Sequence, residues 1–291
     1  MRLTCALVAM AVLSPLQSQE LTVPASWTAR TTPHHIIGNI HYVGTVDLAS
    51  YLIATPDGHI LIDTGLERNA AAVLDGMRSL GFDPTDIRLL LTTQAHFDHV
   101  GAHEEIRKLS GAQVVVSAGD RDVLEGGGQG DYHFGPRYHF PPVTVDRIVH
   151  EGAVISLGGT SLTARLTPGH TKGTTTWTMV AREKAGRLRH VVFMGSTSVN
   201  AGVKLVDNRE YPFIAADYQR SFRVLRNLPC EVFLAAHASA FGGPRKAEAA
   251  RTGTGEAAFV DPDGCRAAVE RSERAFDAEL ERQRTGSAGG R

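Results

Sequence analysis

The chain has 291 residues, of which 42% are hydrophobic and 21% are charged, proportions that exclude a disordered or low-complexity chain. With 30 Lys and Arg against 31 Asp and Glu, the formal net charge is −1, so the chain has no excess charge to attract nucleic acid or an anionic membrane. Thirteen histidines favour metal or acid–base chemistry, whereas three cysteines are too few for a disulfide scaffold.

The N-terminus has the three-part pattern of an export signal. Arg2 gives a short positive region, Leu3–Leu13 is an apolar run interrupted only by Thr4, and small residues with a Pro follow. The run is about half the length needed to span a bilayer. We therefore expect residues 1–18 to be a secretory signal peptide and residues 19–291 to be the exported domain. The alternative is an ordinary buried segment.

Export determines which cysteines remain in the mature protein and whether they can pair. Cys5 would leave with the signal, so Cys230 and Cys265 remain. Because an exported protein meets an oxidising compartment, an even pair suggests one disulfide, which would contribute about 3–4 kcal/mol by closing a loop of about 35 residues. The alternative is two buried free thiols.

The first half of the chain alternates between strands and helices. Apolar and β-rich runs predict five strands: Ile40–Val43, Ser50–Ala54, His59–Ile62, Ile87–Leu91 and Gln113–Val116. Pro56-Asp57-Gly58 predicts a hairpin turn. Apolar positions at helical spacing predict helices over residues 67–80 and 103–109. An irregular loop follows at 126–142, and loops of this length are usually functional or mobile.

The second half repeats this plan. Similar runs predict six strands: Ile148–Val149, Ala153–Leu157, Ser161–Leu166, Thr174–Val180, Leu188–Met194 and Val232–Ala235. Helical patterns cover residues 217–227 and about the last 25 residues, with a frayed polar tail at Gly286–Arg291. The two series predict an α/β fold with two mixed sheets packed face to face and helices outside. No linker or short-period repeat interrupts the chain, which favours a single domain.

Potential metal ligands gather directly after the strand at 87–91. The sequence there is Thr92-Thr93-Gln94-Ala95-His96-Phe97-Asp98-His99, which places four potential ligands within six residues. Side chains at a strand end can converge on an ion, and His and carboxylate ligands suit zinc. Asp98 would also lie near a helix N-terminus, where negative charge is favoured.

Two more histidines follow strand ends in the same way. His170 lies in Thr167-Pro168-Gly169-His170-Thr171, and His237 lies in Ala235-Ala236-His237-Ala238-Ser239. A lone His is more often a surface or core residue than a ligand, and we expect that role for the other candidates: His34, His35, His41, His59, His103, His133, His139, His150 and His190. The expected site gathers six residues around one or two cations: Gln94, His96, Asp98, His99, His170 and His237.

These motifs resemble the metallo-β-lactamase superfamily, whose signature is His-x-His-x-Asp-His, followed by a Gly-His-Thr turn and a late His. Asp63-Thr64-Gly65 and the hairpin before it add to the resemblance, which covers the chain from about Ile36 to the C-terminal helix. The resemblance implies a four-layer αβ/βα sandwich with zinc as its cofactor.

The end of the strand at 188–194 helps to choose a subgroup. Glyoxalase-II-like hydrolases and many lactonases carry a bridging Asp there, and the first two subclasses of class B β-lactamases carry Cys, but this chain reads Phe193-Met194-Gly195-Ser196-Thr197-Ser198. Ser196 resembles the third subclass. Other features agree with it: Ser198, Tyr211-Pro212, Asp217-Tyr218 and the Cys230–Cys265 pair, which family members bridge. The signal peptide agrees with a periplasmic location.

Gln94 departs from the signature because it stands in place of the first His. This substitution resembles the Gln-bearing, GOB-like branch of the third subclass. The resemblance implies a first zinc held by Gln94, His96 and His170, more loosely than by three histidines, because an amide oxygen is a weaker donor than imidazole. It implies a second zinc held by Asp98, His99 and His237. The enzyme could work with the second zinc alone.

The expected function is therefore a zinc-dependent β-lactamase that opens the lactam ring of penicillins, cephalosporins and carbapenems and confers antibiotic resistance. Water on zinc would supply hydroxide at neutral pH, with Asp98 orienting it. Ser196 and Ser198 would hydrogen-bond that water or the substrate carboxylate; the alternative for them is two hydroxyls that end a strand. Residues 126–142 would cover the substrate.

The expected partner is a small β-lactam and the expected state a monomer, without nucleic acid or membrane. Two other functions stay open. One is another metallo-hydrolase of the same fold, such as an acyl-homoserine lactonase. The other is an exported zinc-binding protein without catalysis, for which Gln94 leaves some room.

Overall fold

The computed structural model describes residues 22–135 and 137–288, so the predicted signal peptide at 1–18 lies outside the described residues. A seven-stranded sheet has the order β1-β2-β3-β4-β5-β6-β7. Its strands are β1 His34–Ile37, β2 Ile40–Tyr42, β3 Tyr51–Thr55, β4 Gly58–Ile62, β5 Ile87–Leu91, β6 Gln113–Ser117 and β7 Arg147–Val149. The strands β1 to β4 pair antiparallel, and β4 to β7 pair parallel.

The second sheet has five strands, in the order β12-β11-β10-β9-β8. They are β8 Val154–Leu157, β9 Thr160–Leu166, β10 Thr175–Arg182, β11 Leu188–Met194 and β12 Val232–Ala235. All neighbours pair antiparallel except β11 and β12, which pair parallel. Both sheets are therefore mixed, as the sequence predicts.

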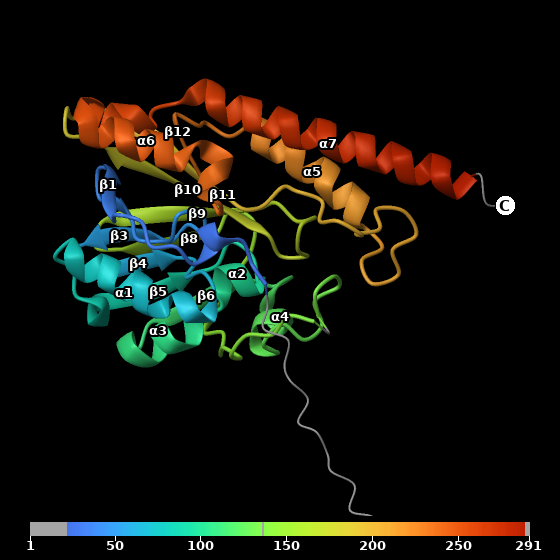
Figure 1. Ribbon diagram of the computed structural model, residues 1–291, viewed down its shortest axis with the longest axis horizontal. Helices are drawn as coiled ribbons and strands as arrows, with labels where there is room; N and C mark the ends of the chain where they lie inside the picture. The colour runs from blue at the N-terminus through green and yellow to red at the C-terminus, as the bar shows by residue number, and fades with distance from the viewer. Residues whose placement is uncertain (1–21, 136, 289–291) are drawn as a thin grey trace, which may run out of the picture.

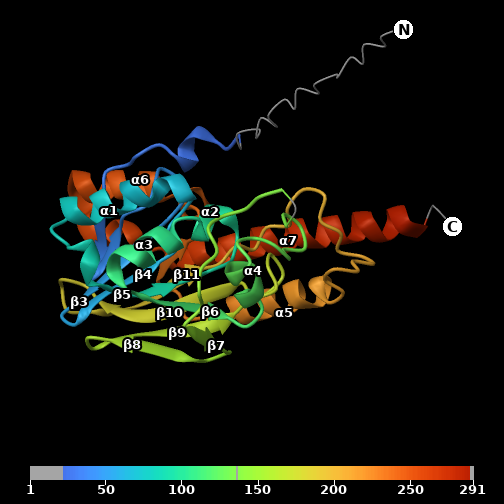
Figure 2. The same cartoon turned by 90° about the horizontal axis from the view of Figure 1, so that it is seen from below.

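Helices cover the outer faces of the two sheets (Figure 1). They are α1 Ala70–Ser79, α2 Phe97–Val100, α3 His103–Ser110, α4 Arg121–Glu125, α5 Ile214–Arg226, α6 Gly243–Ala249 and α7 Pro262–Ala288. Helices α1 and α3 lie on the seven-stranded sheet, and α5, α6 and α7 lie on the five-stranded one; Figure 2 shows the same arrangement from below. The predicted four-layer sandwich is confirmed.

The alternation of side chains along β4 shows how the layers are held together. Ile60 and Ile62 belong to the apolar cluster between the sheets, together with Trp177. Leu61, between them in the chain, belongs to the cluster under α1 and α3, together with Val73. Because successive side chains of a strand point to opposite faces, this one strand contributes to both cores, which explains its unbroken apolar sequence.

Four elements and the C-terminal end differ from the sequence prediction. Strand β1 and the short helices α2, α4 and α6 were not expected, because each is too short for a clear periodicity. The prediction of a frayed tail from Gly286 was wrong for residues 286–288, which continue α7. Near that end, Thr285 Oγ1 donates to the carbonyl of Glu281 at 3.0 Å, and Arg282 pairs with Glu279, contacts that support the last turns.

The expected disulfide is present. It joins Cys230 to Cys265, whose Cα atoms are 6.4 Å apart. The bond connects the first turn of α7 to the chain just before β12, so the long helix is fixed at the edge of the five-stranded sheet.

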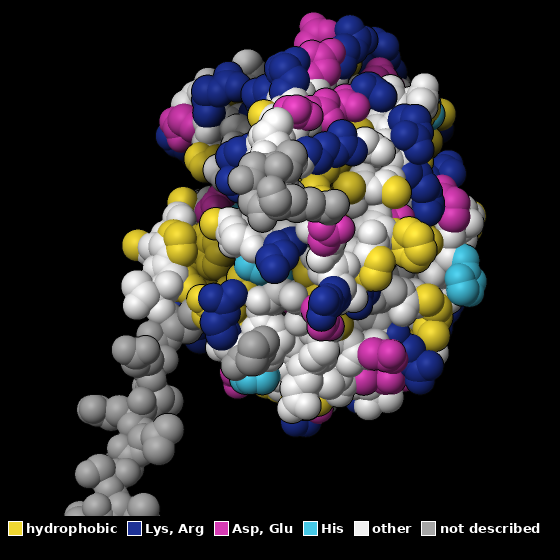
Figure 3. Space-filling model, turned by 90° about the vertical axis from the view of Figure 1, so that its right-hand side faces the viewer, with side chains coloured by type: hydrophobic (Ala, Val, Ile, Leu, Met, Phe, Trp, Pro, Cys, Tyr) yellow, Lys and Arg dark blue, Asp and Glu magenta, His cyan; other side chains and the backbone are white. Residues whose placement is uncertain are grey.

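Two further features concern the helices and the surface. Among the described residues, none of the helices combines the length and the apolar character that a bilayer crossing requires. The face drawn in Figure 3 carries basic and acidic side chains intermixed, in keeping with the net charge of −1.

Candidate metal centre

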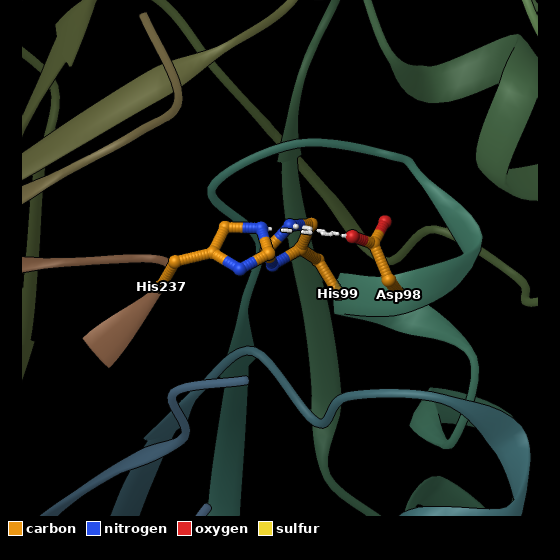
Figure 4. Close-up of side chains that lie close together, drawn as sticks. All are labelled: Asp98, His99 and His237. Atoms are coloured by element: carbon orange, nitrogen blue, oxygen red, sulfur yellow. Dashed lines mark ion pairs between the residues drawn. The ribbon is translucent and has the colours of Figure 1, made fainter. Parts of the chain in front are cut away.

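Three of the expected ligands converge on one point (Figure 4). Asp98, His99 and His237 each offer a ligand atom, and these atoms lie within 4.8 Å of one another. The Oδ2 atom of Asp98 is 3.4 Å from Nε2 of His99 and 3.7 Å from Nε2 of His237. Asp98 and His99 lie on α2, directly after β5, whereas His237 follows β12. The cluster is thus built from the ends of strands in both sheets.

A carboxylate lies behind each of the two histidines of this cluster. Nδ1 of His237 lies 3.1 Å from Oδ2 of Asp47, which also accepts the backbone N–H of Ser239 at 2.9 Å through its other oxygen. Nδ1 of His99 lies 3.5 Å from Oδ2 of Asp63. The hydrogen bond at Nδ1 of His237 fixes the tautomer of that ring and turns its Nε2 toward the cluster, the arrangement that usually supports metal-binding histidines.

Asp63 is held in an unusual backbone conformation. Its φ is +55°, a left-handed value that is uncommon for a residue with a side chain. Its carboxylate accepts the backbone N–H of Thr93 at 2.8 Å and the hydroxyl of the same residue. These bonds tie Asp63, at the end of β4, to the ligand-bearing segment after β5.

Gln94 lies beside the cluster with its amide oxygen unsatisfied. Its side chain is fully buried, and its Nε2 donates to Oγ of Ser196 at 2.9 Å. Its Oε1 has no hydrogen-bond partner among the described residues. Nε2 of His99 is in the same state. An unpartnered buried polar atom costs free energy, and a bound cation would satisfy the amide oxygen of Gln94.

His96 and His170 lie together as the remaining expected ligands. Their ring centroids are 4.8 Å apart. Nε2 of His96 lies 3.3 Å from Oδ2 of Asp131. Nδ1 of His170 donates to the carbonyl of Ser198 at 2.7 Å, which leaves its Nε2 as the available ligand atom. Together with Gln94 they supply two nitrogens and one oxygen.

Burial and charge set the protonation of the site. Burial lowers the pKa of His170 to about 3, with the neighbouring His96 adding to the effect, so the ring is neutral, as a metal ligand must be. Burial alone would lower the pKa of His99, but the carboxylates of Asp98 and Asp63 raise it. Burial would raise the pKa of Asp98, but the histidines around it lower it. The surroundings of Asp98 and His99 therefore favour a carboxylate and positive charge beside it, whereas His170 is held neutral.

The loop at 126–142 forms one wall of the site. The ring of Phe134 packs edge-on against that of His96, with centroids 4.8 Å apart. The hydroxyl of Tyr132 donates to the carbonyl of His170 at 3.0 Å. With Asp131 facing His96, the loop is docked on the ligands.

Sequence reasoning did not find the residues that support the ligands. Asp63 stands out in the sequence only as part of a motif, and Asp47, Asp120 and Asp131 belong to no pattern at all. Asp120 is buried and accepts the backbone N–H groups of Ala95 and Gly173 at 2.9 and 2.8 Å. Such groups are scattered in the sequence, so only the fold brings them together. The expected structural role of His103 agrees with its place between Thr64 and Thr92 hydroxyls.

The sequence and the fold were compared with known proteins. The model of the metallo-β-lactamase superfamily matches residues 43–237. The native FEZ-1 metallo-β-lactamase from Legionella gormanii is 43% identical, with 89% of this chain and 98% of that chain covered and a TM-score of 0.87. The class B3 di-zinc metallo-β-lactamase LRA-12 from an Alaskan soil metagenome is 35% identical, with 90% and 99% covered and a TM-score of 0.85.

Curated relatives are more distant. A hydroxyacylglutathione hydrolase of Rhodospirillum rubrum is 30% identical over 57% of this chain and 52% of its own length. The N-acyl homoserine lactonase AttM of Rhizobium johnstonii is 28% identical over 42% of this chain and 56% of its own length. The chain thus spans about half the length of these curated relatives.

Proposed function

Because the chain belongs to the metallo-β-lactamase superfamily, we propose that this hydrolase is a zinc-dependent β-lactamase that opens the lactam amide of penicillins, cephalosporins and carbapenems and so confers antibiotic resistance. The observation that carries the proposal is the cluster of Asp98, His99 and His237, backed by carboxylates and bordered by Ser196 and Ser198. Similarity to solved β-lactamases over nearly their whole length supports it.

We assign the ligands as the sequence predicts them. Asp98, His99 and His237 would hold one zinc ion, and Gln94, His96 and His170 would hold the other. Imidazole nitrogen and carboxylate or amide oxygen are donors that suit zinc. A bound zinc ion polarises a carbonyl oxygen and makes water acidic enough to act as a nucleophile near neutral pH.

The chain's own residues would bind and orient the reactants. The buried Asp98 is ionised, so it can accept a hydrogen bond from the attacking water and orient it toward the lactam carbonyl. Ser196 and Ser198 line a cavity of about 270 Å³ together with His237, so their hydroxyls can donate to a substrate carboxylate. Phe134 packs against His96, and Tyr132 donates to the carbonyl of His170, so the loop holds these two rings in place.

A lactonase or thioesterase is the second candidate, because a lactonase and a glutathione thioester hydrolase are among the curated relatives. The residue after β11 argues against it. Ser196 stands where such hydrolases carry a bridging Asp, and its hydroxyl accepts from the amide of Gln94. A neutral hydroxyl would hold a cation less strongly than the negatively charged carboxylate of an Asp would.

One substrate panel tests the assignment. Purified protein loaded with zinc is offered a chromogenic cephalosporin, an acyl-homoserine lactone and a glutathione thioester, with metal analysis of the same sample. We expect turnover of the cephalosporin at a kcat/KM at least about a hundredfold above the other two, since differential transition-state binding sets specificity. Turnover of the lactone or thioester without the cephalosporin would replace the proposal with the second candidate.

The role of Gln94 can be tested by metal binding alone. Replacing it in Gln94→His puts an imidazole where the weaker amide donor stands, so the first site should bind zinc about tenfold more tightly and its occupancy should rise. Zinc titration with metal analysis measures this. The exposed Gln113 gives a control, Gln113→His, which should leave both quantities unchanged. Equal zinc affinity and stoichiometry in Gln94→His and wild type would show that Gln94 is not a ligand.

We also propose that the protein is exported to the periplasm and is a monomer. The Cys230–Cys265 disulfide supports export, because such bonds form in oxidising compartments. The signal peptide and the monomeric state stay predictions from the sequence.

A further inference from the structure

A small cavity lies beside the candidate metal centre, and one of its walls is formed by residues that have no role in the proposed function so far. It has a volume of about 270 Å³ and lies between the segments after β11 and β12 on one side and helix α7 on the other. Ser196, Ser198 and His237 line the first side. Arg271 and Ser272 line the second. A cationic side chain therefore shares a cavity with the proposed substrate-binding hydroxyls.

The backbone of α7 is fixed against this cavity. The hydroxyl of Thr197 donates to Oγ of Ser272 at 2.9 Å, which joins the helix to the segment between Ser196 and Ser198. The disulfide at Cys265 holds the first turn of the same helix. The position of Arg271 is thus set by its neighbours, while its long side chain keeps the freedom to reach into the cavity.

Arg271 has no acidic partner of its own. Three nearby carboxylates of the helix pair with other arginines: Glu270 with Arg274, Glu273 with Arg226 and Glu279 with Arg282. Across residues 22–135 and 137–288, no ion pair involves Arg271. Its guanidinium therefore remains available for an anion that enters the cavity.

The cavity continues along the helix. A second hollow of about 580 Å³ lies between residues 198–202 and α7, and it shares Ser198, Arg271 and Ser272 with the first. The two form one groove that leads away from the metal cluster, with Arg271 where they meet. A molecule whose reacting bond lies at the cluster can extend along this groove past the guanidinium.

We propose that Arg271 binds the carboxylate of the substrate and thereby selects anionic β-lactams. Penicillins, cephalosporins and carbapenems carry a carboxylate on the carbon next to the ring nitrogen, and guanidinium groups match carboxylates in both charge and geometry. Ser196 and Ser198 donate to the same carboxylate from the opposite side of the cavity. This inference rests on the proposed function, since it concerns how that substrate is recognised.

The test compares Arg271→Gln and Arg271→Glu with the control Arg274→Gln, which removes an exposed arginine one turn further along α7. Steady-state kinetics are measured with benzylpenicillin and with its methyl ester, which lacks the negative charge. Arg271→Gln should raise KM for the acid about tenfold while kcat changes little, and Arg271→Glu should raise it further. Neither change should affect the ester, and Arg274→Gln should match the wild type with both.

A binding measurement separates this inference from the proposed function. Penicilloate, the ring-opened dicarboxylate, is titrated into each variant and followed by calorimetry, which requires no turnover. Weaker binding in the Arg271 variants supports the inference even if the wild type opens no β-lactam, an outcome that would overturn only the proposed function. Equal binding and equal KM values for the Arg271 variants and the control overturn the inference, even if the wild type is an active β-lactamase. A wild type without turnover or binding overturns both.

Discussion

Removal of bound metal with a chelator is expected to reduce β-lactam hydrolysis to the uncatalysed background. The reason is that the clustered side chains of the site are of the kinds that bind a metal ion, and they do not make water nucleophilic by themselves. Asp98, His99 and His237 turn their ligand atoms toward one another, and a carboxylate lies beside the other nitrogen of each histidine. Such residues bind and orient, but the water must be activated by the cation.

The measurement is the rate of cephalosporin hydrolysis before and after dialysis against a chelator, with the metal content of each sample. Adding zinc back should restore the rate, whereas magnesium should not, because magnesium prefers an octahedral set of oxygen ligands. Circular dichroism of the dialysed protein shows whether the fold persists. Full activity in a folded sample without metal would remove the metal from the mechanism.

The second large effect is expected at His237. The change His237→Ala removes one of three ligands from the cluster, so kcat/KM should fall at least about a hundredfold, and zinc should bind more weakly. The milder change Asp47→Asn keeps the ligand but replaces the carboxylate that faces its Nδ1 at 3.1 Å. It should cost about tenfold to a hundredfold, the range typical of residues behind metal ligands.

His150→Ala, at an exposed position, is the matched control and should behave as the wild type. Zinc titration accompanies the kinetics, because a residue that acts through the metal changes both together. If His237→Ala keeps wild-type turnover, the residue does not belong to the site. If Asp47→Asn equals the control in zinc affinity and in rate, the carboxylate has no positioning role.

The sequence predicts the parts of the fold that depend on local pattern. The bounds of β5 and β12 are as expected, because both are short and mainly apolar: β5 is apolar except for the exposed Arg88, and β12 is apolar throughout. Strand β1 is not predicted because it begins with two histidines, His34 and His35, and obtains its strand character by pairing with β2. Helix α2 is not predicted because four residues are too few for a helical period.

The candidate site also has a part that the sequence predicts and a part that it does not. The segment from Gln94 to His99 is compact in sequence, so the order of its residues alone indicates metal chemistry. The partners behind the ligands come from distant positions: Asp47 reaches His237 across 190 residues of sequence. Arg271 likewise gives no signal in the sequence, because its meaning depends on the cavity that it shares with Ser196. Residues of this kind are recognised only when strand ends and helices are placed together.

The origin of the ligands in two different sheets has a consequence for stability. Asp98 and His99 follow a strand of the seven-stranded sheet, whereas His237 follows a strand of the five-stranded one. An ion that coordinates all three acts as a cross-link between the halves of the molecule, and it binds only while both halves are folded. Its binding free energy therefore adds to the free energy of unfolding. The zinc-loaded protein would unfold as one unit, at a temperature that rises with the concentration of free zinc.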